Sequence, residues 1–216
     1  MNNVRKFVAT VLVAAVLVII GVSPSSASAK TNPFVDLPRS HTHYDSIVTL
    51  YHLGIVEGTS SNRFSPNQDA TRQEAALYLA NALGLNTVNV PDPGFRDVPK
   101  SSKYHGAIAA LYHAGIINGY PDGTFKPTAT LKRSQIAKMI TLGFDLKISN
   151  RTTTPFKDVN VIKDTATKQY IQTLVDYKIT TGTTPTTFSP YMSLKRGQLA
   201  TFLNRSISNF QVIGVE

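Results

Sequence analysis

Residues 119–127 read Gly-Tyr-Pro-Asp-Gly-Thr-Phe-Lys-Pro, and residues 95–97, upstream of them, read Phe-Arg-Asp. Landmarks from these two stretches occur three times in the same order: a Phe-x-Asp, a Gly, a Phe-x-Pro and an Arg. The copies are Phe34/Asp36, Gly58, Phe64/Pro66 and Arg72; Phe95/Asp97, Gly119, Phe125/Pro127 and Arg133; and Phe156/Asp158, Gly182, Phe188/Pro190 and Arg196. The Phe-x-Asp motif recurs every 61 residues (95 − 34 and 156 − 95). Units repeated at such a period bury their apolar faces mainly against one another, so functional residues are expected at recurring positions.

The first 29 residues have a different composition. Arg5 and Lys6 precede an apolar run over residues 7–22, and Ala27-Ser28-Ala29 follows. This pattern predicts a secretory signal peptide, residues 1–29, with an uncleaved membrane anchor as the alternative. Cleavage after Ala29 would leave 187 residues (216 − 29) and a formal charge of +7 (+9 − 2), so the mature chain stays basic.

The composition of the mature chain limits how it is stabilised and what it meets. The chain contains no cysteine, so an exported protein of this sequence must rely on packing rather than on disulfides. Its length suffices for a sizeable core shared by the three copies, which favours one compact domain. A positive charge suits anionic wall polymers, lipid headgroups or extracellular nucleic acid, and the charge alone does not choose among them.

Each copy predicts two helices joined by an ordered loop. Apolar residues recur at helical spacing first near residues 47–55, 108–116 and 171–179. The first helix should end at Gly54 or Gly58, at Gly115 or Gly119, and, in the third copy, where Lys178 replaces the first glycine, near Gly182. The Phe-x-Pro phenylalanines should pin the loops.

The second helix of each copy should begin after an N-cap residue and turn an apolar stripe inward. Its expected N-caps are Asp69, Thr130 and Ser193. The stripes are Ala76, Leu79 and Leu83; Ala137, Ile140 and Phe144; and Ala200, Leu203 and Ile207. The predicted repeats span residues 30–85, 92–147 and 153–207, with a short tail at 208–216. The fold class predicted from these patterns is all-α.

An arginine recurs where helix electrostatics disfavours it. Arg72, Arg133 and Arg196 fall in the first turn of the second helix, where a cation is unfavourable by about 0.3–1 kcal/mol. Lys132 and Lys195 add to the mismatch in the later copies. Three such placements predict a neighbouring anion. It is either internal, the Phe-x-Asp carboxylate, or an external carboxylate or phosphate bound by the guanidinium and the helix N–H groups.

These motifs resemble the S-layer homology (SLH) family. The resemblance rests on Phe-x-Asp-Val at 95–98 and 156–159, Ala-Gly-Ile-Ile-x-Gly at 114–119, Gly-Tyr-Pro-Asp-Gly-Thr-Phe-x-Pro at 119–127, and Thr-Arg-Gln-Glu at 71–74. It covers residues 33 to about 207. It implies a pseudo-threefold bundle of three repeats that anchors non-covalently to the bacterial cell wall through grooves between adjacent repeats.

The resemblance also implies a ligand and a set of residues. The ligand would be an anionic secondary cell-wall polysaccharide associated with peptidoglycan, often carrying pyruvate ketals. The residues expected to bind it are Arg72, Arg133, Arg196, Asp36, Asp97, Asp158, Gly58, Gly119 and Gly182, with Lys132 and Lys195 added by this chain.

Three departures from the family pattern affect these sites. The motif glutamate survives as Glu74 but becomes Gln135 and Gln198, and the motif threonine becomes Lys132 and Lys195. Both changes make the second and third sites more positive. The third copy has Lys178 in place of a glycine. We therefore rank the sites of Arg72 and Arg133 above that of Arg196.

Two other function classes remain open at this point. A wall-glycan-degrading enzyme would need two opposed carboxyl groups, yet the glutamates are only Glu57, Glu74 and Glu216, and none recurs. A nonspecific binder of nucleic acid or membrane would need a continuous basic stripe, whereas the basic residues recur at one helix start per copy. The expectation is thus a secreted, non-enzymatic wall-binding module without metal or cofactor, working alone or recruiting a protein partner.

Overall fold

The computed structural model describes residues 31–213, with side chains to residue 209, so the predicted signal peptide lies outside the described residues. The helices are α2 (Tyr44–His52), α3 (Arg72–Ala82), α4 (His105–His113), α5 (Arg133–Gly143), α6 (Lys157–Asn160), α7 (Thr165–Asp176) and α8 (Arg196–Ile213). Within this range no β-strand is formed, which confirms the all-α prediction. α8 continues to Ile213 through the segment expected to be a tail. None of the described helices is long and apolar enough to cross a membrane.

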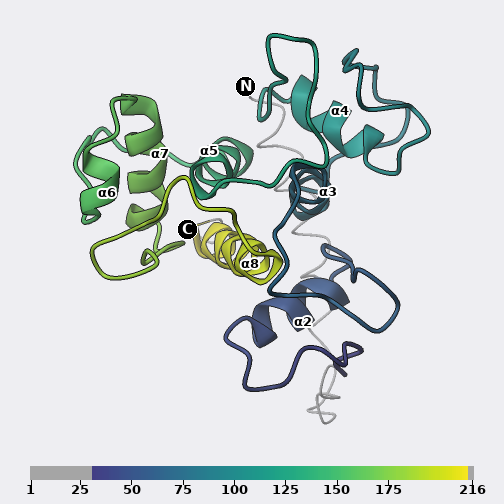
Figure 1. Cartoon of the computed structure of the whole chain (residues 1–216), viewed down its shortest axis with the longest axis horizontal. Helices are drawn as coiled ribbons and strands as arrows, with labels where there is room; N and C mark the ends of the chain where they lie inside the picture. The colour runs from purple at the N-terminus through teal and green to yellow at the C-terminus, as the bar shows by residue number, and fades with distance from the viewer. Residues whose placement is uncertain (1–30, 214–216) are drawn as a thin grey trace.

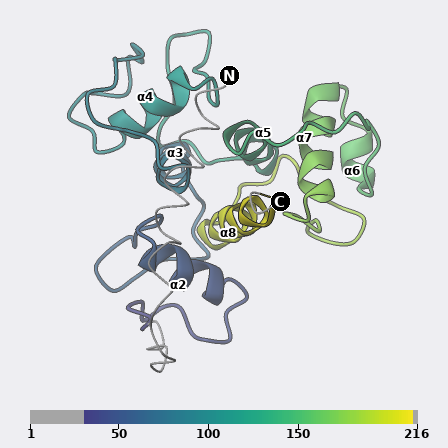
Figure 2. The same cartoon turned by 180° about the vertical axis from the view of Figure 1, so that it is seen from behind.

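The helices form two layers around one axis. The second helices of the repeats, α3, α5 and α8, form the centre, and α2, α4 and α7 lie outside them (Figures 1 and 2). Each outer helix packs against the central helix of the preceding repeat: α4 against α3 and α7 against α5. α2 packs against α8, so the first repeat closes the ring on the third. The predicted pseudo-threefold arrangement is confirmed.

Three backbone hydrogen bonds join the repeats at the axis. The N–H of Ala70 donates to the carbonyl of Leu194, that of Leu131 to Ala70, and that of Leu194 to Leu131, each at 2.8 Å. All three side chains are fully buried. Because each repeat donates to one neighbour and accepts from the other, all three repeats must be present for all of these groups to be satisfied.

The central helices begin two residues later than the sequence suggested. Thr71 is the N-cap of α3 and Lys132 that of α5, while α8 starts at Arg196. The predicted N-caps were wrong because the residues before each helix are extended and pair across the axis. Their bridges are Asp69 with Lys195, Thr71 with Thr130, and Lys132 with Ser193.

The predicted apolar stripes form the core. Every stripe residue of the three central helices is buried, and so are the loop phenylalanines Phe64, Phe125 and Phe188. The core therefore consists of one cluster shared by all repeats. Burial of this apolar surface replaces the missing disulfides as the source of stability.

Two glycine positions in each repeat have different physical roles. Gly54 and Gly115 end the outer helices with φ of +69° and +72°, and Lys178 takes the same left-handed conformation at φ 55°. Gly58, Gly119 and Gly182 instead lie under the Phe-x-Asp phenylalanine. A β-carbon at Gly119 would overlap the Phe95 ring and lie 2.9 Å from the Thr124 carbonyl oxygen.

Gly119→Ala should lower the free energy of unfolding by about 2–3 kcal/mol, because neither the ring nor the backbone carbonyl can retreat easily. Urea denaturation measures the change. The matched control is Gly115→Ala, which has open space around it and carries only the positive-φ penalty of about 1 kcal/mol. An equal loss in the two variants would contradict the steric role of Gly119.

His43 lies at the junction that closes the ring. Its Nδ1 is 2.8 Å from Thr201 Oγ1 of α8, and its ring packs against Gly197. Burial lowers the pKa of His43, and the neighbouring His41 and Arg205 charges act in the same direction. The neutral imidazole is therefore the form that fits the interface between the first and third repeats.

Stability should fall as the pH drops through about 6.5, the ordinary histidine value, towards the lower pKa of folded His43. In that window the unfolded chain binds a proton that the folded chain does not, so the full contribution is present only above it. Urea unfolding at pH 7.5 and pH 5 should show the loss, and His43→Gln should reduce it. His52→Gln, at an exposed position, should leave the loss unchanged; a pH-independent wild type would contradict the assignment.

Candidate functional site

Each recurring arginine reaches from its own repeat into the loop of the next. Its Nε donates a hydrogen bond to the carbonyl of the loop phenylalanine, and its guanidinium lies over that phenylalanine ring. The pairs are Arg72 with Phe125 (2.8 Å, and 4.4 Å from Cζ to the ring centroid), Arg133 with Phe188 (2.7 Å and 4.6 Å) and Arg196 with Phe64 (2.9 Å and 4.7 Å). We name the places where these three contacts lie the Arg72, Arg133 and Arg196 grooves, and a cavity is described below for the first of them.

The helix N–H groups at these arginines are already occupied. The N–H of Arg72 donates to the Ala129 carbonyl at 3.0 Å, and that of Gln73 to the Pro127 carbonyl at 2.9 Å. The corresponding bonds in the other grooves join Arg133 to Met192, Ser134 to Pro190, Arg196 to Gln68 and Gly197 to Pro66. The expectation that helix N–H groups bind an external anion was therefore wrong, because the next repeat's loop supplies their acceptors.

The Phe-x-Asp aspartates hold the loops rather than pairing with the arginines. Both Asp97 oxygens accept backbone N–H groups, from Phe125 and Lys126, at 2.8 Å. Asp36 and Asp158 accept from Phe64 and Ser65, and from Phe188 and Ser189. Burial would raise the pKa of Asp36, but these two N–H bonds outweigh it and lower the pKa.

The sequence-based alternative of an Arg–Asp ion pair is therefore replaced by a relay. The aspartate accepts the phenylalanine N–H, and the arginine of the preceding repeat donates to the same residue's carbonyl. Within residues 31–209 no ion pair joins these aspartates to Arg72, Arg133 or Arg196. The aspartates thus fix the direction of the carbonyl that the arginine grips.

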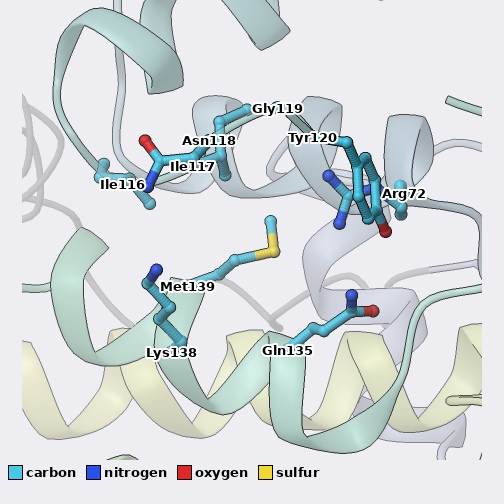
Figure 3. Close-up of a pocket in the computed structure, with 9 residues that line it drawn as sticks. All are labelled: Arg72, Ile116, Ile117, Asn118, Gly119, Tyr120, Gln135, Lys138 and Met139. Atoms are coloured by element: carbon cyan, nitrogen blue, oxygen red, sulfur yellow. The ribbon is translucent and has the colours of Figure 1, made fainter. Parts of the chain in front are cut away.

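The Arg72 groove is an open cavity of about 240 Å³ (Figure 3). Its wall consists of residues 116–120 on one side and Gln135, Lys138 and Met139 of α5 on the other. The Tyr120 ring lies between two cations, 5.1 Å from Arg72 Cζ and 4.2 Å from Lys126 Nζ. A positive charge, an aromatic face and amide groups thus meet in one place. The sequence interpretation missed Lys138. The one hint of its role in the sequence was its position near the start of α5, close to Arg133.

The Arg72 and Arg133 side chains are largely buried, and no acid among the described residues lies within ion-pair distance of their guanidinium groups. The two residues are 9% and 2% exposed, and their Nη groups make no hydrogen bond within the described part of the chain. Burial lowers the pKa of Arg133 to about 10 although the Asp158 charge opposes it, and burial also lowers the pKa of Arg72. Burial of a charge is costly, and here the acids that oppose the effect of burial, Asp97 and Asp158, form no ion pair with these arginines.

Lys132 and Lys195 contact the extended segments at the axis. Lys132 Nζ donates to Ser193 Oγ at 3.4 Å, and Lys195 Nζ pairs with Asp69 at 2.6 Å. The structure thus does not bring these two lysines to the guanidinium groups.

The aligned histidines hold the segments that lead into the repeats. His52 Nε2 contacts the Thr31 carbonyl at 3.0 Å, and His113 Nε2 contacts the Pro91 carbonyl at 2.9 Å. In the third repeat Asp176, at the same position, forms an ion pair with Arg151 of the preceding linker. His52, His113 and Asp176 therefore each hold the segment that precedes their repeat. Their alignment at equivalent positions in the three copies was the sequence signal for a shared role.

A family model for the S-layer homology domain matches residues 33–76, 94–137 and 155–200, which coincide with the three repeats. The chain belongs to the S-layer homology family. It is 31% identical over 211 residues to an S-layer protein of Bacillus thuringiensis subsp. finitimus and to the S-layer protein sap of Bacillus anthracis, covering 97% of this chain. It is 29% identical over 198 residues to a cellulosome-anchoring protein of Acetivibrio thermocellus, covering 85% of this chain and 41% of that protein.

This SLH chain spans about a quarter of the length of the two S-layer proteins (25%). An endoglucanase of Bacillus sp. (strain KSM-635) also matches, over 19% of its length. The feature shared with these surface proteins is therefore the repeat module. Family and relatives together indicate a cell-surface module.

Asp97→Ala should lower the free energy of unfolding by about 2 kcal/mol, because it strands two backbone N–H groups in a partly buried loop. Thermal and urea denaturation measure the effect. Asp45→Ala, which removes an exposed carboxylate from α2, is the matched control and should change stability by less than about 1 kcal/mol. Wild-type stability of Asp97→Ala would contradict the loop-holding role.

Proposed function

We propose that this chain attaches non-covalently to an anionic, pyruvylated secondary cell-wall polysaccharide, which it binds in grooves between its repeats. The observation that carries the proposal is the Arg72 guanidinium, buried at the edge of an open cavity without an acidic partner. A carboxylate or phosphate on the polymer would supply the counter-charge. Charge-assisted hydrogen bonds from a guanidinium to such a group are short and directional.

The chemistry of the cavity wall suits an acidic sugar. Arg72 and Lys138 provide positive charge, and Tyr120 lines the cavity with its ring against the Arg72 and Lys126 cations. Gln135 and Asn118 offer amide groups to hydroxyls. In this proposal Asp36, Asp97 and Asp158 and the glycines Gly58, Gly119 and Gly182 act by shaping the loops, and the arginines contact the ligand.

Arg72→Ala combined with Arg133→Ala should lower retention on native cell walls by at least about tenfold, since each lost charge-assisted bond is worth about 1.5–3 kcal/mol. Pull-down with native walls, followed by walls stripped of the secondary polymer, measures this. Wild-type protein should be retained on the native walls alone.

The matched control is Lys157→Ala with Lys163→Ala. It removes the same charge from two exposed positions, one in α6 and one between α6 and α7. Circular dichroism of every variant establishes that it is folded. Equal retention on native and stripped walls, or equal losses in the two double variants, would overturn the proposal. Release of reducing ends from the walls would indicate an enzyme instead.

A further inference from the structure

The three grooves differ in acidic content. The glutamates in the described part of the chain are Glu57 and Glu74, and both lie at the Arg196 groove. The corresponding positions, 61 and 124 residues further on, are Asn118 and Thr181, and Gln135 and Gln198. Glu57 reaches Arg196 through its backbone carbonyl, so Glu74 is the acid that faces this arginine, and the matching residues of the other two repeats are neutral glutamines.

Glu74 joins two functions in one side chain. Its Oε2 accepts from the Thr71 N–H at 2.8 Å and from Thr71 Oγ1 at 2.7 Å, which completes a capping box at the start of α3. Its Oε1 forms an ion pair with Arg196 Nη1. The carboxylate is thus held in place by its own helix and directed at the arginine of the third repeat.

Arg196 consequently has acceptors on every nitrogen. Nη1 contacts Glu74, Nη2 donates to the Glu57 carbonyl at 2.8 Å, and Nε donates to the Phe64 carbonyl at 2.9 Å. The residue is 1% exposed, and the Glu74 side chain is 12% exposed. An external carboxylate could reach this guanidinium only by displacing a buried, hydrogen-bonded one.

The glutamine at this position in the other repeats keeps the cap and removes the charge. Gln135 Oε1 accepts from the Lys132 N–H at 2.9 Å, and Gln198 Oε1 accepts from the Lys195 N–H at 3.1 Å. The Nη groups of Arg72 and Arg133 form no ion pair with any described residue. The Glu-to-Gln difference at this capping position therefore separates one arginine whose Nη group meets an acid from two whose Nη groups meet none among the described residues.

We propose that the Glu74 carboxylate occupies the Arg196 groove in place of an external acid. The chain would then bind the acidic groups of its polymer at two sites, those of Arg72 and Arg133. The inference rests on the proposed function and adds the number of working grooves and the residue that sets it. Displacing Glu74 would leave its charge buried without a partner, which an incoming carboxylate of the same charge does not offset. Replacing Glu74 by glutamine converts the Arg196 groove into a third site.

The experiment is isothermal titration calorimetry of the chain with a simple sugar that carries a pyruvate ketal. Wild type should bind two molecules and Glu74→Gln three, since glutamine already caps the equivalent helices. The matched control is Glu57→Gln, which removes the same charge from a residue that meets Arg196 only through its backbone. Its carboxylate pairs with Lys103 and only its backbone carbonyl contacts Arg196, so it should bind two.

A second variant keeps the test independent of how well Glu74→Gln folds. Arg72→Ala with Arg133→Ala should show no remaining site, because the Arg196 groove is filled. One remaining site, three sites in wild type, or two in a folded Glu74→Gln would overturn the inference while leaving the proposed function intact. No binding by wild type and by Glu74→Gln would overturn the proposed function itself.

Discussion

The structure depends on one interaction repeated three times: an arginine at the start of a central helix donates its Nε hydrogen to a phenylalanine carbonyl in the next repeat. An aspartate fixes that carbonyl by accepting the phenylalanine N–H, so the two motifs that recur in the sequence meet at one residue. Because Arg196 reaches back to Phe64, the third repeat is joined to the first and the ring closes. Each groove is therefore built by two repeats, one that supplies the arginine and one that supplies the loop.

The same arrangement explains why a cation is kept at a helix N-terminus. The helix N–H groups donate to carbonyls of the next loop, and the guanidinium lies on an aromatic ring and is held through Nε. These contacts fix the position of the charge without neutralising it. The positive charge that remains on Nη is then available to whatever acid occupies the groove. In the Arg196 groove that acid is Glu74.

Much of the fold could be predicted from the sequence, because apolar spacing within a repeat is a local signal: the buried stripes Ala76–Leu79–Leu83 and their counterparts are where periodicity placed them. Which loop faces which arginine could not be predicted. Arg196 sits against the loop of Phe64, although Lys178 and Gly182 of its own repeat seemed its natural neighbours. The spacing of apolar residues is the same whether a repeat packs on itself or on its neighbour. Which of the two occurs becomes clear only from the closed ring of three repeats.

The ranking of Arg196 below Arg72 and Arg133 therefore rested on Lys178, whereas the structural difference between the grooves arises at Glu74. The N-caps were displaced for a related reason, since pairing across the axis extends the chain before each helix.

The central claim is that Arg72 and Arg133 keep an unpaired positive charge for an external acid while Arg196 does not. Side-chain ¹⁵N NMR of the arginines during titration with a simple sugar that carries a pyruvate ketal tests it most directly. The Nη resonances of Arg72 and Arg133 should shift and exchange more slowly with water as ligand is added, and those of Arg196 should stay unchanged. Shifts of all three arginines, or of Arg196 alone, would contradict it.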